Sequence, residues 1–190
     1  MRVFVAGASG VLGTRLVPLL VAAGHEVAGM TRSAWKAEGL RVSGAEPIVC
    51  DAFDAVALRE AVVSFAPEVV VNELTDLPDH PASTNEPNAR MRREGTRNLL
   101  AAAEAAGASH FVAQSVAWQL PGDAGAAVGE LETRVLAAGG VVLRYGRLYG
   151  PGTYYEGDKP DPPRIHVDDA APRTVPTLDA PSGIIDVTDD

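Results

Sequence analysis

Short runs rich in valine and isoleucine alternate along this chain with longer stretches whose apolar residues recur at helical spacing. Continuous apolar runs are typical of buried parallel strands, and the periodic stretches between them are typical of amphipathic crossover helices. The pattern predicts strands at Arg2–Ala6, Glu26–Met30, Glu46–Cys50, Val69–Asn72, His110–Gln114, Val141–Arg144 and Ile184–Val187. It predicts helices at Val11–Ala23, Ala55–Phe65, Thr84–Ala106 and Gly125–Ala138.

This alternation predicts an α/β fold: a doubly wound, mostly parallel, Rossmann-like sheet of about seven strands with helices on both faces. Pro151–Pro163 is rich in proline, glycine and aspartate and predicts a surface loop. Asp168–Leu178 predicts only a poor helix, because Pro172 and Pro176 each remove a backbone donor. We expect one domain over residues 1–190, with a loop-rich, reduced substrate region at about 145–183.

Glycines directly follow the first predicted strand and open the first predicted helix. Gly7, Gly10 and Gly13 have the spacing that lets a backbone turn sharply, approach a pyrophosphate and point free helix N–H groups at it. The segment therefore predicts a dinucleotide-binding crevice. Its expected cofactor-binding residues are Gly7, Ser9, Gly10, Val11, Leu12 and Gly13.

Composition narrows the class of protein. A formal net charge of -9 and a pI near 4.9, with scattered Lys and Arg, argue against a nucleic-acid-binding surface. The single cysteine, Cys50, cannot form an internal disulfide, and no apolar run is long enough to span a bilayer. We therefore expect an acidic cytoplasmic protein that binds a small molecule, with no membrane, nucleic-acid or metal partner.

Several separated motifs resemble the short-chain dehydrogenase/reductase superfamily, in particular its extended and atypical NAD-dependent epimerase/dehydratase-like members. Besides the glycines, these motifs are Cys50–Asp54, Glu94–Leu100, Phe111–Ser115, Leu143–Gly152 and Ile165–Ala170. The chain is shorter than extended members, with less material after Gly152. In such relatives the helices at about 84–106 and 125–138 pack on their copies, so the resemblance implies a possible homodimer.

The resemblance also assigns the remaining cofactor residues. No acidic residue ends the second strand, where NAD-preferring relatives bind the ribose diol; Arg32 there implies NADP(H) rather than NAD(H), with Thr31 or Ser33 assisting. Asp51 and Ala52 follow the third strand, and Asp51 is expected to accept a hydrogen bond from the adenine amino group. Asn72, Glu73 and Leu74 end the fourth strand and are expected to line the ribose.

The family's catalytic Tyr-x-x-x-Lys pair is missing. Alignment on Glu132 puts Ala124 at the tyrosine position and Val128 at the lysine position. The expected catalytic candidates are Ser115 as a hydrogen-bond donor to a substrate oxygen and Tyr145 or Tyr149 as an acid. His166 in His-Val-Asp-Asp is expected to orient the loop before a helix.

Two functions remain open on the sequence. The first is an atypical NADP(H)-dependent oxidoreductase acting on a small carbonyl or conjugated substrate. The second is a non-redox descendant of the fold, either an isomerase, dehydratase or cyclase that uses a carboxylate such as Glu73, Asp76 or Asp79, or a nucleotide-sensing binding protein. The intact glycine segment and Arg32 favour the first function, and the missing tyrosine and lysine favour the second.

Overall fold

A computed structural model describes residues 1–77 and 86–189. Within them, seven strands form one parallel sheet in the order β3-β2-β1-β4-β5-β6-β9. The strands are β1 (Arg2–Ala6), β2 (Glu26–Thr31), β3 (Glu46–Val49), β4 (Val69–Asn72), β5 (His110–Val116), β6 (Val141–Tyr145) and β9 (Gly183–Val187). The Rossmann-like, doubly wound fold is thus confirmed, and the strand order reverses between β1 and β4.

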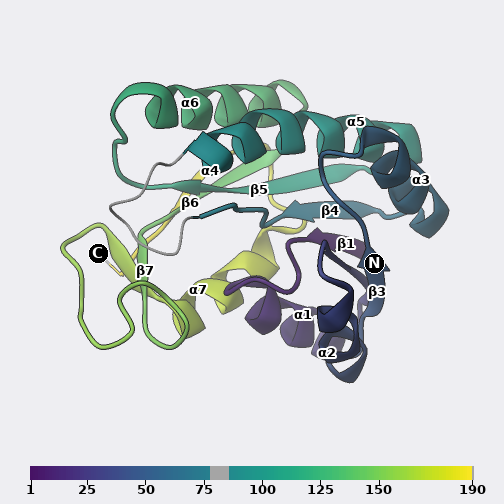
Figure 1. The fold of residues 1–190 in the computed structure, drawn as a ribbon, viewed down its shortest axis with the longest axis horizontal. Coiled ribbons are helices and arrows are strands. Elements are labelled where there is room, and N and C mark those ends of the chain that lie inside the picture. The colour runs from purple at the N-terminus through teal and green to yellow at the C-terminus, as the bar shows by residue number, and fades with distance from the viewer. Residues whose placement is uncertain (78–85, 190) are drawn as a thin grey trace.

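Helices cover the two faces of the sheet as separate layers (Figure 1). One layer holds α3 (Ala55–Phe65), α4 (Glu86–Arg90), the π-helical segment η2 (Met91–Gly95), α5 (Thr96–Ala106) and α6 (Gly122–Ala137). The opposite layer holds α1 (Gly13–Ala22), α2 (Ala37–Val42) and α7 (Val167–Thr174). None of the helices in the described part of the chain is long and apolar enough to cross a membrane.

Successive side chains along each strand point to opposite faces of the sheet, so the apolar core has two parts, one beneath each helix layer. On β1, Val3 and Val5 pack toward α1 and α7, whereas Phe4 and Ala6 pack toward α3 and α5. The central strands β1, β4 and β6 are largely buried on both faces, which explains why they are continuous apolar runs rather than alternating ones, whereas the edge strands β3 and β9 are only partly buried.

The predicted elements are all present, with small shifts at their ends. β5 continues to Val116, and α6 begins at Gly122 instead of Gly125. α1 begins at Gly13, because residues before it form the turn. The first two residues of the predicted helix from Thr84 lie outside the described residues.

Four short elements were not predicted. They are the 3-10 turn η1 (Ala34–Lys36), α2, and a parallel pair of three-residue strands, β7 (Arg147–Tyr149) and β8 (Arg164–His166), on either side of the predicted loop. Runs this short show no measurable periodicity. The predicted poor helix is α7 followed by a 3-10 turn, η3 (Val175–Thr177), which takes Pro176 into its first turn.

A glycine contrast tests the tight packing at the start of α1. A Cβ on Gly13 would meet the Gly7 carbonyl oxygen and the Ala8 backbone, whereas a Cβ on the exposed Gly129 of α6 would meet nothing within 4 Å. We expect Gly13→Ala to destabilise the fold by about 2–3 kcal/mol, because backbone atoms cannot move aside as side chains can. Gly129→Ala, the matched control, should stabilise it by roughly 0.5–1 kcal/mol.

Urea unfolding followed by circular dichroism measures both changes. Equal effects of the two substitutions would show that the strand-to-helix turn is not under steric constraint.

Candidate functional site

The glycine turn joins β1 to α1 at the carboxyl edge of the sheet. Gly7 has φ +86° and lies under the backbone of the next strand, since a Cβ on it would come within 2.5 Å of the Glu73 carbonyl oxygen. α1, which lies wholly within the described residues, has no side-chain cap at Leu12 and no acidic residue in its first turn. Its positive end is therefore open to an anion such as a pyrophosphate.

The end of β2 is tied to this turn. The hydroxyls of Ser9 and Thr31 lie 2.8 Å apart, and Thr31 Oγ1 also accepts a hydrogen bond from the backbone N–H of Ser33 at 3.2 Å. Thr31 is buried, so it holds the two loops together. Its neighbours Arg32 and Ser33 are more exposed than Thr31.

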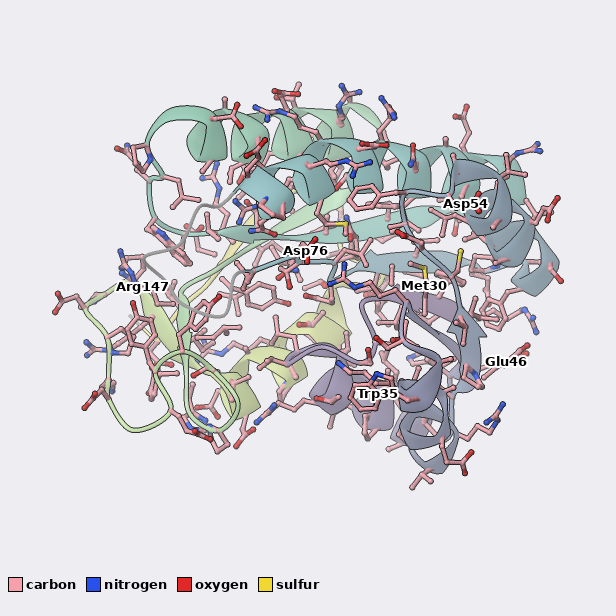
Figure 2. The ribbon with its side chains drawn as sticks, in the orientation of Figure 1. Met30, Trp35, Glu46, Asp54, Asp76 and Arg147 are labelled. Carbon is pink, nitrogen blue, oxygen red and sulfur yellow. The ribbon has the colours of Figure 1, made fainter. Side chains whose placement is uncertain are left out.

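Arg32 faces across the crevice from β2 toward the loop after β4. Its guanidinium donates to Asp76 Oδ1 at 3.0 Å, while 61% of the Arg32 side chain stays exposed. Figure 2 shows Asp76 in the space between the two helix layers. An exposed arginine of this kind can rotate onto a phosphate at little free-energy cost, since surface ion pairs contribute at most about 1 kcal/mol.

The segment after β3 contains two carboxylates, those of Asp51 and Asp54, that accept different backbone hydrogen bonds. Asp54 caps α3 by accepting from the Ala57 N–H at 3.0 Å, and Asp51 Oδ1 accepts from the Phe53 N–H at 2.9 Å. Asp51 itself is exposed, which leaves its second oxygen accessible from solvent. Ala52 is buried, and its carbonyl accepts a hydrogen bond from Asn98 on α5.

The end of β4 sends neighbouring side chains to opposite layers. Asn72 donates to Thr96 of α5 at 3.1 Å and accepts from the Leu74 N–H at 3.2 Å. Glu73, the next residue, points to the other layer and is buried with 5% exposure. Its Oε2 has no hydrogen-bond partner among the described residues.

Burial raises the pKa of the Glu73 carboxyl to about 8, because the charged form loses its hydration. The hydrogen bond from Tyr145, at 3.4 Å, lowers the pKa by less than burial raises it. Glu73 is therefore a neutral carboxylic acid at pH 7.

Tyr145, at the end of β6, connects this acid to α7. Its hydroxyl lies 2.6 Å from the hydroxyl of Thr174, and both residues are buried. Burial, together with the nearby Glu73, raises the pKa of the Tyr145 phenol well above its usual value. Glu73, Tyr145 and Thr174 thus form a buried chain of exchangeable protons, which we call the acid chain.

Ser115 lies on the opposite face of the sheet from the acid chain. Its hydroxyl donates to Glu132 Oε1 on α6 at 2.6 Å, and Arg144 of β6 binds both oxygens of the same carboxylate, at 2.9 and 2.6 Å. These bonds keep the pKa of Glu132 below its usual value despite its partial burial. Ala124 and Val128 precede Glu132 at four-residue intervals on α6, so they lie on the same helix face.

Tyr149 lies in the small β7–β8 sheet. Its hydroxyl donates to Asp189 at 2.8 Å, and its ring contacts His166 edge-on, with the centroids 5.1 Å apart. His166 Nδ1 accepts from the Asp168 N–H at the start of α7. This contact has the orienting role expected for His166.

The structure thus brings the expected cofactor residues of β1, β2, β3 and β4 to one edge of the sheet. It separates the three catalytic candidates: Tyr145 lies in the acid chain, Ser115 under α6, and Tyr149 beside β8. The sequence reasoning missed Thr174 and Arg144, whose partners are far away along the chain. Asp79, an alternative carboxylate, lies outside the described residues.

Comparisons with known proteins bear on the family and on the fold. A family model described as NAD(P)H-binding matches residues 7–138. A 3-diazoavenalumate denitrifying reductase from a Streptomyces species is 39% identical over 237 residues, covering 100% of this chain and 76% of that protein. Because this match is longer than the 190 residues of the chain, the relative carries further residues inside the matched span.

Solved structures resemble the fold as a whole. The Thermus thermophilus UDP-glucose 4-epimerase in complex with NAD superposes with a TM-score of 0.78 at 21% identity, covering 99% of this chain and 78% of the epimerase. The Campylobacter jejuni UDP-Glc/GlcNAc 4-epimerase superposes with a TM-score of 0.81 at 14% identity, with the same coverage of 99% and 78%.

Fold and glycine turn together define a dinucleotide-binding protein of the Rossmann class. The chain belongs to the NAD(P)H-binding family whose model it matches over most of its length.

The neutral state of Glu73 gives a stability prediction. Its pKa is about 8 in the folded chain against 4.5 for an ordinary glutamate, so its stabilising contribution is complete below pH 4.5 and declines until about pH 8. We expect Glu73→Gln to gain stability relative to the parent chain by roughly 1.4 kcal/mol per pH unit between about pH 5 and 7.

Urea unfolding at several pH values measures this difference. Glu46→Gln on β3, which replaces a glutamate on the outside of the molecule (Figure 2), is the control. A pH-independent difference between the parent chain and Glu73→Gln would contradict a neutral buried acid.

Proposed function

We propose that this protein is an NADP(H)-dependent oxidoreductase that reduces a small carbonyl or conjugated substrate without the usual tyrosine and lysine. The observation that carries the proposal is the intact glycine cradle, in which Gly7 and Gly13 leave no room for a Cβ beside the open end of α1. The reductase relative at 39% identity supports a redox reaction rather than a non-redox use of the same cleft.

The preference for NADP(H) rests on Arg32. A guanidinium at the end of β2 can bind the two charged oxygens of a 2′-phosphate, whereas an unphosphorylated ribose would be served better by a carboxylate. Ser33 can add a hydroxyl donor. In the structure the Asp76 carboxylate is paired with Arg32, and this ion pair would have to break before Arg32 could bind the phosphate.

The residues present fit this cofactor and divide the remaining tasks. The glycine turn and the N-terminus of α1 would hold the pyrophosphate, Asp51 the adenine, and the segment Asn72–Leu74 the ribose. When bound, the cofactor supplies a hydride donor. What this chain must add is a place for the substrate and, for some substrates, a proton.

The missing pair restricts the substrate class. Hydride addition to a simple carbonyl creates a strongly basic alkoxide that needs an acid, yet Ala124 and Val128 carry no proton at those positions. Hydride addition to an enone gives an enolate, which is a weaker base than an alkoxide. An aryl diazonium ion loses N2 and gains the hydride, so this reduction needs no proton. The relative's name includes a diazo substrate, so such compounds belong in the test.

Cofactor choice is tested by titrating NADPH and NADH into the purified protein, with calorimetry as the readout. We expect Arg32→Asp to lower NADPH affinity by at least about tenfold, since the phosphate contact is lost and a repelling charge is added, and not to lower NADH affinity, since a carboxylate at this position can bind the ribose hydroxyls. Asp76→Asn should raise NADPH affinity, because it frees the arginine and removes a negative charge.

Arg41→Asp is the control for cofactor choice, because Arg41 lies on α2 and pairs with Glu38. Equal NADPH and NADH affinities in the parent chain would refute the NADP(H) preference.

Turnover is tested by following NADPH oxidation with a panel of aldehydes, quinones, enones and an aryl diazonium salt. We expect conjugated acceptors and the diazonium salt to react at least about tenfold faster than simple aldehydes, because they need little or no protonation. Tight NADPH binding with no oxidation by any member would refute the oxidoreductase and favour the non-redox reading.

A further inference from the structure

Two buried hydrogen-bond donors on one helix lack partners among the described residues. They are Nδ2 of Asn88 in α4 and Nη1 of Arg92 in η2. Asn88 is 0% exposed and Arg92 8% exposed, so solvent does not satisfy them. An unpaired buried donor destabilises a fold, because it has lost its hydration without gaining a protein partner, and the cost is greater for a charged donor.

The helix face that carries these donors is fixed over the carboxyl end of β4. Asn88 Oδ1 accepts from the backbone N–H of Asp76 at 3.0 Å, just beyond that strand. Thr96, further along the same helix, accepts from Asn72 at the end of β4. Arg92 lies between these two anchors in sequence and, like them, is buried. The donors therefore lie at the edge of the sheet where ligands bind in this fold class.

The carboxylate that attracts Arg92 is already bound by other groups. Glu132 attracts Arg92 electrostatically, but its oxygens are held by Ser115 and by the bidentate Arg144, which Asp186 also attracts. Arg92 therefore keeps a buried Nη1 donor that has no partner among the described residues. A buried cation with a free donor is stabilised by an anion that accepts from it.

The next residue, Arg93, does not share the unpaired donor of Arg92. It lies one residue along the same helix and is paired on the surface with both Asp123 and Glu130. Arg93 therefore has no capacity for a ligand anion, whereas Arg92 does.

We propose that Arg92 and Asn88 form a subsite for a carboxylate of the substrate. Arg92 Nη1 and Asn88 Nδ2 donate to the two carboxylate oxygens, and the rest of the substrate extends toward the ends of β4 and β5. This inference rests on the proposed function, and it narrows the substrate class to small conjugated acids.

The cofactor's own phosphates do not account for these donors. The glycine turn and Arg32 belong to β1 and β2, whereas the carboxylate subsite lies over β4 and faces α6, which packs against β5 and β6. The two anion sites are thus on opposite sides of the point where the strand order reverses.

The test uses the full chain saturated with NADPH and measures the binding of cinnamate and of its neutral counterpart, cinnamamide, by calorimetry. We expect cinnamate to bind at least about tenfold more tightly than cinnamamide, since charge-assisted bonds form only with the anion. Equal affinities for the two probes would overturn the subsite without any variant.

Variants then assign the donors. Arg92→Met keeps an unbranched side chain and removes the guanidinium, and Asn88→Asp keeps the acceptor for Asp76 while removing the free donor and adding a repelling charge. Each should reduce cinnamate affinity at least about tenfold and leave cinnamamide affinity unchanged. Arg93→Met is the matched control and should bind cinnamate as the parent chain does. Retained NADPH binding by the two subsite variants would show that they fold.

Displacement and turnover experiments distinguish the carboxylate subsite from a phosphate site and from a failure of the proposed function. Displacement of cinnamate by lower concentrations of inorganic phosphate would overturn the carboxylate assignment. Cinnamate binding that depends on Arg92, without NADPH oxidation by any compound of the panel, would support the subsite and refute the proposed oxidoreductase. NADPH oxidation with equal rates for acids and their methyl esters would do the reverse.

Discussion

The contact between the glycine turn and the end of β4 is the constraint on which the rest of the site depends. Gly7 reaches under the Glu73 backbone because it has no Cβ, and Gly13 starts α1 directly against the carbonyl of Gly7. This close approach brings the open helix end to the point where the strand order reverses. A side chain at either glycine would push α1 away from the sheet and widen the crevice that receives the cofactor.

The crevice has two chemically different sides beside this contact. The side chains at the end of β4 alternate between the two helix layers, as successive residues of a strand do. Asn72 points to the helix layer of α4, η2 and α5, where Asn88 and Arg92 each have a donor without a partner among the described residues. Glu73 points to the layer of α7, where it accepts a hydrogen bond from Tyr145, whose hydroxyl also lies beside that of Thr174. A ligand lying across the end of this strand would meet a cationic side and a neutral acidic side.

The sequence predicted what depends on local pattern and missed what depends on distant partners. The strands, the long helices and the glycine turn follow from apolar runs, helical spacing and short-range sterics, and all are present. β7 and β8 are three residues each and pair only because the chain returns after a long loop. The hydrogen bond of Ser115 to Glu132 and the burial of Arg92 depend on how α6 packs against η2 and the sheet. So does the lack of a partner for Arg92 Nη1 within the described residues, and no pattern within either segment encodes this packing.

The buried polar groups Glu73 and Arg92 also bear on what could replace the tyrosine and lysine that the resemblance would place in this protein. A neutral Glu73 and a charged Arg92 both reduce the stability of the fold at pH 7, since each has a buried polar atom without a partner in the part of the chain that the structure describes. Leucine or methionine at these positions would pack without that penalty. Groups that destabilise a fold and lie at the ligand edge of its sheet are typical of binding and catalytic positions. The crevice is therefore not chemically empty although Ala124 and Val128 stand where the resemblance would place a tyrosine and a lysine; its polar groups come from the end of β4 and the helix at 88–92 instead of from α6.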